Sequence, residues 1–147
     1  MADPTPAACS WRPRRRPSVV NTLLIVSGGL AAFMVVGHST LGRRKFFLHM
    51  LAADFDPTAK RIMTFVWHMS TITLAVAALA LLYGGLGYLE PAVLEPLAVY
   101  AGIQFLAYGA LHLFLVTTSK LSGAVYKQFQ WSLFLAVGST ALLDVLP

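Results

Sequence analysis

Three of the four histidines in this chain lie inside strongly apolar stretches, where an imidazole is the most versatile ligand available. His38 ends a run rich in Gly, Ala and Val, His68 follows Trp67 in the segment WHMSTITL, and His112 lies within LHLFLV. Neutral imidazole is the commonest metal ligand in proteins and also binds haem iron. Histidines that meet from facing helices at one depth would therefore form a coordination site.

The segments that carry these histidines are long and apolar enough to cross a membrane. The chain of 147 residues is 57% hydrophobic and only 12% charged, with a mean hydropathy of +0.69, whereas soluble domains carry roughly 25% charged residues. Because about 18 consecutive apolar residues indicate a transmembrane helix, four such helices are predicted, at about 19–39, 57–83, 91–118 and 129–146. The fold class is thus an all-α integral membrane bundle forming one domain, 19–147.

Two further segments complete this organisation. Residues 1–18 are rich in proline and arginine and have no hydrophobic period, which predicts a disordered or cleavable tail. Between the first two transmembrane helices, the sequence FFLHMLAADF (46–55) predicts a short interfacial helix whose apolar side faces the lipid. The pair Asp56-Pro57 is typical of a helix start, since the acid caps the helix and proline suits its first position.

Helices that alternate in direction bring the histidines to one side of the membrane. With a rise of about 1.5 Å per residue, His38, His68 and His112 would lie roughly 7 to 12 Å inside the interfacial charges. These three are the predicted ligands of haem b or of a transition metal, and His49 in the loop above is a reserve metal ligand. Trp67 and Tyr108 would flank such a cofactor. The competing interpretation is structural, because one histidine hydrogen bond can fix the packing of two helices.

A second regularity follows one side of the third predicted helix. Tyr100, Gln104, Tyr108 and His112 recur at steps of four residues and therefore share a side, the polar stripe. Polar side chains avoid lipid, so we expect this stripe to face the bundle interior. It indicates helix packing or, as an alternative, a path for a solute or proton.

The basic residues indicate contact with lipid headgroups. The net charge of +5 would suit nucleic acid in a soluble protein, but in a membrane protein Lys and Arg gather beside the helices and set the topology. Nucleic-acid binding is therefore not expected. Arg43, Arg44 and Lys45 are the predicted site for anionic headgroups. The two loops on this side carry seven basic residues and the opposite side four, all in the tail, which favours a bacterial inner-membrane protein with these loops cytoplasmic and both termini outside.

The pattern GHSTLG (37–42), followed by WHMSTITLAVAALALL (67–82), resembles a group of small uncharacterised bacterial four-helix membrane proteins. The shared residues are a Gly-His pair at the end of the first helix, a glycine before the charges, and Trp-His-x-Ser in the second helix. They correspond to Gly37, His38, Gly42, Trp67, His68 and Ser70. The resemblance covers roughly residues 20 to 117 and implies the four-helix fold. Many members have Gly-Glu where this chain has Gly42-Arg43.

The leading functional hypothesis is a structural or accessory component of a membrane assembly, in contact with the bilayer and with other membrane subunits or with itself. The partner surface would be the small-residue side of the first helix, formed by Ser27, Gly28, Gly29, Ala31 and Ala32. The alternatives are a histidine-ligated haem or metal redox protein and a small oligomeric transporter or channel. An enzyme is not favoured, because the single cysteine excludes CxxC chemistry and no H-E-x-x-H, G-x-S-x-G or phosphate-loop motif is present.

Overall fold

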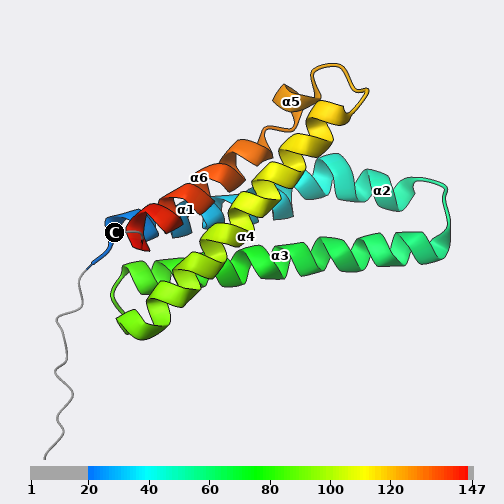
Figure 1. Ribbon diagram of the computed structural model, residues 1–147. Coiled ribbons are helices and arrows are strands. Elements are labelled where there is room, and N and C mark those ends of the chain that lie inside the picture. Colours follow the sequence, from blue (N-terminus) through cyan, green and yellow to red (C-terminus); the bar gives the residue numbers. More distant parts are fainter. Residues whose placement is uncertain (1–19, 146–147) are drawn as a thin grey trace, which may run out of the picture.

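The computed structural model describes residues 20–145, and all regular structure in that range is helical. The tail predicted at residues 1–18 lies outside the described residues. In chain order the elements are α1 (Thr22–Gly37), η1 (His38–Phe47), α2 (Leu48–Ala52), α3 (Pro57–Gly85), α4 (Pro91–Thr118), α5 (Ala124–Lys127) and α6 (Gln130–Val145) (Figure 1).

The first three elements form one uninterrupted helical rod of 31 residues, Thr22–Ala52. The sequence predicted a break near residue 39 and a separate interfacial helix, but the backbone N–H of His38 still bonds to Met34 and Val35. Between α1 and α2, the element η1 is a π-helix. Its i to i+5 hydrogen-bond pattern continues to the bond from Leu48 N–H to the Arg43 carbonyl. Arg and Lys are good helix formers. The basic triplet Arg43, Arg44 and Lys45 therefore makes this part of the rod polar without ending the helix.

Three helices are long and apolar enough to span a bilayer: Thr22–Ala52, Pro57–Gly85 and Pro91–Thr118. The fourth apolar helix, α6, has 16 residues and is about 24 Å long, against a hydrocarbon thickness of about 30 Å. At the start of α3, Asp56 Oδ1 accepts a hydrogen bond of 2.8 Å from Ala59 N–H, and Pro57 takes the first helical position. The structure therefore has the helical composition of an integral membrane protein.

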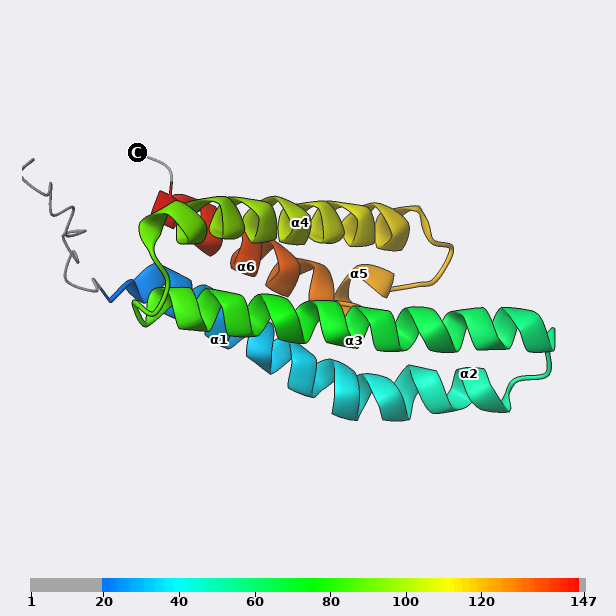
Figure 2. The same ribbon diagram turned by 90° about the horizontal axis from the view of Figure 1, so that it is seen from below.

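The helices form two antiparallel pairs joined along one side. One pair is α1 with α3, the other is α4 with α6, and α1 also packs on α6. The consecutive helices α3 and α4 have little contact, because they meet at their short connection and then diverge (Figure 1). The view in Figure 2 shows the same separation, with α2 beside the first turns of α3 and α5 beside the end of α4.

We call the end with the α3–α4 connection the closed end, because the two pairs are tied together there. Asn21 donates its backbone N–H to the Gly85 carbonyl at 2.7 Å and its side-chain amide to Asp144 of α6. Further along α1, the fully buried Ser27 donates its hydroxyl to the Val137 carbonyl of α6 at 2.8 Å. These bonds join three helices through the first two turns of α1.

Glycines allow the backbones of each pair to approach closely. A Cβ at Gly138 of α6 would lie 2.8 Å from the Gly102 carbonyl oxygen and from Leu106 N of α4. In the other pair, a Cβ at Gly28 would lie 2.8 Å from Leu82 N of α3. Small residues at helix interfaces are the usual means of close association in membranes. The same α1 surface was predicted to bind a partner, but Ser27, Gly28 and Ala31 are buried inside the chain.

The opposite end holds the connections Ala53–Asp56 and Ser119–Gly123, and we call it the loop end. The hydrophobic core belongs mainly to the other half of the molecule, where Leu24, Leu81 and Phe105 are almost completely buried. Towards the loop end, the polar and aromatic side chains singled out in the sequence replace this core. That half of the fold is where the candidate sites lie.

Candidate functional site

An aromatic cluster joins η1 to α3 and contains two of the predicted histidine ligands. We define it as His38, Phe47, Trp67 and His68. The rings of His38 and Trp67 stack with centroids 3.9 Å apart, and those of Phe47 and Trp67 with centroids 5.0 Å apart. The edge contact from Phe47 to His68 spans 5.7 Å. The indole of Trp67 is therefore the central ring, in contact with both of the η1 side chains.

The π-helical backbone and one glycine make room for this stack. Extended π-helix is rare, and π-bulges are frequently found at functional sites. A Cβ on Gly42 would lie 3.0 Å from the tip of the Trp67 ring, tighter than ordinary van der Waals contact. His38 Nε2 lies 3.4 Å from the Trp67 carbonyl oxygen, which also accepts the Thr71 hydroxyl at 3.0 Å. Gly42 thus lets the indole lie across η1, with His38 against the α3 backbone.

A mostly apolar cavity of about 370 Å³ adjoins this stack. The residues of its lining that carry polar side-chain atoms are His38, Trp67 and Ser70. The complete lining is His38, Phe46, Phe47, Met50, Ile62, Met63, Val66, Trp67 and Ser70. Its volume is within the lower part of the range of about 300–1,000 Å³ for small-molecule pockets. Ser70 belongs to the sequence pattern but, like the methionines, was not predicted as a site residue, although it follows Trp67 by three residues and so shares its side of α3.

Most of the residues that carry the sequence resemblance lie at the contact between η1 and α3, which we call the η1–α3 seam. His38, Gly42 and Trp67 are in direct contact, and Ser70 lines the same cavity. Gly37 is different, because a Cβ there would have no neighbour within 4 Å. The sequence pattern therefore marks one place in the fold, at the contact between η1 and α3.

The third predicted ligand, His112, lies on the other helix pair. Its Nε2 is 3.4 Å from Gln128 Oε1, and its ring lies 6.3 Å from that of Phe134 on α6. Tyr108 contacts the same phenylalanine at 5.8 Å, while His49 is exposed on α2. Among residues 20–145, no three His, Cys, Asp or Glu side chains come close enough together to hold a metal ion.

The polar stripe of α4 points partly out of the molecule. Tyr100 is 65% exposed and Tyr108 38% exposed, whereas the sequence predicted that the stripe would face the interior. Gln104 Nε2 donates a hydrogen bond of 2.9 Å to the Tyr108 hydroxyl, one turn further along. The inward side of α4 is instead lined by Ala98, Gly102, Phe105 and Gly109. Close packing on α6 takes the small residues, and this turns the tyrosines outward.

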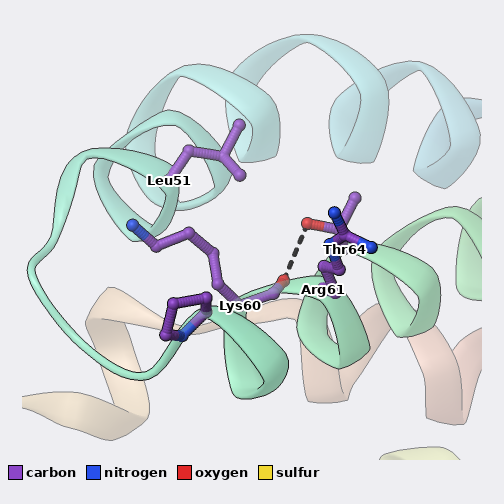
Figure 3. A pocket seen from close by; sticks show the side chains of 5 residues that line it. Leu51, Lys60, Arg61 and Thr64 are labelled. Atoms are coloured by element: carbon purple, nitrogen blue, oxygen red, sulfur yellow. Dashed lines mark hydrogen bonds between the residues drawn. The ribbon is translucent and has the colours of Figure 1, made fainter.

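The basic residues at the loop end border a second cavity, also of about 370 Å³, between α2 and the start of α3 (Figure 3). It is lined by Leu51, Pro57, Lys60, Arg61 and Thr64. In the sequence, Lys60 and Arg61 indicated only the orientation of the helices, and their place around a cavity was not predicted. Their position directly after the helix start at Pro57 was the available signal. The predicted headgroup residues Arg43, Arg44 and Lys45 are all exposed on η1.

Comparison with protein-family models, with curated proteins and with solved structures finds no match to this chain. The class of protein therefore follows from the helices themselves, which are those of a helical membrane protein.

Proposed function

We propose that this protein is a structural or accessory component of a membrane assembly and that the polar stripe of α4 is covered by a helix of another subunit. The observation that carries the proposal is the exposure of Tyr100 and Tyr108, joined by the half-buried Gln104, on a helix long and apolar enough to span a membrane. Polar groups at membrane depth normally face protein or water. An exposed stripe of this kind is therefore suited to hydrogen bonding across a helix–helix interface.

The stripe has unused hydrogen-bonding capacity for such a contact. Gln104 donates to Tyr108, which leaves its side-chain carbonyl oxygen free to accept from a neighbour. The Tyr100 ring is the most exposed member of the stripe, and Tyr side chains combine an apolar body with a polar tip. A partner helix would cover both rings and bond to the amide between them.

The proposal includes four membrane crossings, with α6 as the shortest. The apolar stretch of the sequence runs from Phe129 through residue 146, slightly beyond the described part of α6. The uneven distribution of Lys and Arg favours a cytoplasmic loop end, with the closed end and both termini outside. In this orientation η1 and α2 enter the interface, since Arg43, Arg44 and Lys45 are exposed there.

Site-specific photo-crosslinking in native membranes tests the proposed interface. A benzoylphenylalanine placed at Tyr100 or Tyr108 should give one discrete protein adduct, and mass spectrometry of that adduct identifies a second copy or a different subunit. The matched controls are Val99 and Ala110, which are also exposed but lie on a side of α4 turned away from the stripe. Adducts of equal yield from all four positions, or none from the tyrosines, would contradict the proposal.

A haem or metal redox role is the second candidate, and it rests on His38 beside an apolar cavity with His68 nearby. His112 belongs to the other helix pair, so this version uses only the η1–α3 seam. The purified protein should then show a Soret band or a stoichiometric metal that is lost in both His38→Ala and His68→Ala. A colourless, metal-free protein would leave these histidines with a packing role.

A further inference from the structure

We infer that the cavity between α2 and the first turns of α3 is a binding site for one anionic phospholipid, whose phosphate is attracted by Lys60 and Arg61. The site is distinct from the exposed triplet on η1, because its two cations belong to a concave surface with apolar walls. This inference depends on the membrane location of the protein and is independent of a partner at the α4 stripe.

The lining of the cavity combines the two chemistries of a lipid molecule. Lys60 and Arg61 supply positive charge, while Leu51 supplies an apolar wall from α2 (Figure 3). Pro57 at the start of α3 adds a second apolar wall. Lys60 is half-buried, and its ammonium lies 5.4 Å from the Phe55 ring, which holds the charge at the loop end. Figure 3 shows the Lys60 side chain extending towards the α2–α3 connection and the Arg61 side chain beside Thr64, so the two positive charges lie along the cavity. A phosphate at this cavity would be matched in charge, and an acyl chain would continue along apolar surface.

The order of residues along α3 fits the order of groups in a phospholipid. Arg61, Thr64 and His68 are three and four residues apart, so they follow one side of the helix towards the membrane centre. Thr64 lies about 4.5 Å and His68 about 10 Å deeper than Arg61 along the helix axis. His68 is exposed on this side. It can therefore donate a hydrogen bond to the ester region of a lipid whose phosphate is at Arg61.

The two acidic residues of the connection Ala53–Asp56 reduce the positive charge near the cavity only in part. Asp56 directs its carboxylate to Ala59 N–H and so caps α3 instead of facing the cavity. Asp54 is exposed in the same connection and is not part of the lining. Removing its charge should strengthen phosphate binding, since the local field then becomes more positive.

Native mass spectrometry of the full chain in mild detergent tests the site directly. The probes are dioleoylphosphatidylglycerol, dioleoylphosphatidylcholine and inorganic phosphate, each titrated separately. We expect the wild-type protein to retain one phosphatidylglycerol and to retain the choline lipid and phosphate far more weakly. Because one basic residue near an anionic surface strengthens binding about fivefold, Lys60→Gln/Arg61→Gln should weaken phosphatidylglycerol binding about 30-fold.

Variants that remove the same number of charges elsewhere distinguish binding at this cavity from attraction of the lipid by the net charge of the protein. Lys120→Gln/Lys127→Gln removes two charges from the other loop region and should leave retention unchanged, whereas Lys60→Arg keeps the charge and should retain the lipid. Asp54→Asn should increase retention. The melting temperature in detergent confirms that each variant is folded.

Three outcomes would overturn the inference. Equal losses in the two double variants would mean that only net charge attracts the lipid. Equal retention of the choline lipid would mean that the cavity does not recognise the anionic headgroup. Phosphate that displaces the lipid at similar concentration would assign the cavity to a free anion.

Discussion

The two ends of this molecule are built from different kinds of contact. At the closed end, backbones touch through glycines and Asn21 and Ser27 bond to neighbouring helices. At the loop end, aromatic rings, an imidazole and basic side chains lie between η1–α2 and α3. A bilayer offers little hydrophobic drive for helix association, so close packing of small residues must supply it. The closed end therefore holds the fold together, and the loop end is free to present side chains for binding.

The largest expected effect is an added side chain at the glycine seam of α4 and α6. Gly138→Val should destabilise the protein by about 3 kcal/mol or prevent assembly, because overpacking typically costs 1–3 kcal/mol and here the obstructing atoms are backbone. Thermal unfolding in detergent measures the loss. Gly29→Ala is the control, since nothing lies within 4 Å of its Cβ, and it should be neutral or slightly stabilising. Similar losses of stability in both variants would contradict a particular role for the close contact between α4 and α6.

The next effect concerns the bond that joins α1 to α6. Ser27→Ala removes the hydroxyl that binds the Val137 carbonyl and should cost about 1 kcal/mol, the usual size of an interhelical hydrogen bond in a membrane. Ser132→Ala is the comparison, because that exposed hydroxyl bonds only within its own segment and should change stability little. A stability loss at position 132 as large as at 27 would contradict the role of the α1–α6 bond.

At the loop end, the added methyl group of Gly42→Ala should change the fluorescence spectrum of Trp67 more than it changes the free energy of unfolding. Gly42→Ala moves the Trp67 indole, since the added Cβ would meet its tip at 3.0 Å. In a variant with Trp67 as the sole tryptophan, we expect a shifted emission maximum and a stability change below about 1 kcal/mol. Gly37→Ala has no neighbour within 4 Å and should leave the emission unchanged. Equal spectra for both variants would count against the stack.

The smallest expected effect is on the α4 stripe. Tyr108→Phe removes the acceptor of the Gln104 amide at a partly exposed position and should change the stability of the isolated protein by less than about 0.5 kcal/mol. The substitution should instead weaken the contact with the proposed partner helix, so that crosslinking from position 100 decreases. A large stability loss in the isolated chain would mean that this bond supports the fold itself.

Much of the helical organisation could be predicted from the sequence, because apolar length and proline position are local properties. The starts of α3 and α4 at Pro57 and Pro91 are examples. The continuous rod through residue 52 was missed, since the sequence of η1 contains no signal for an i to i+5 pattern. The side of α4 that faces inward was predicted only in part, since Tyr108 and His112 lie against Phe134 of α6 while Tyr100 is 65% exposed. Polarity favoured burying Tyr100, but close approach to α6 required Gly102 and Gly109 on that side.

The histidines show the same limit. Their common side of the membrane was predicted from helix direction. In the structure His112 lies near the loop end of α4, whereas His38 lies near the middle of the rod Thr22–Ala52. Depth alone does not specify which helices are neighbours, so His38 and His68 belong to one aromatic cluster with Trp67 and Phe47, while His112 packs against α6.

By itself, the amino-acid sequence determined that this chain is helical, apolar enough for a membrane, and basic beside two of its connections. Those properties follow from hydrophobic length and charge, which act within single segments. Only the tertiary structure decided which helices pair, because pairing depends on where glycines allow backbones to meet. That choice divides the histidines between two helix pairs, leaves Tyr100 and Tyr108 exposed, and brings Lys60 and Arg61 together with Leu51 around one cavity.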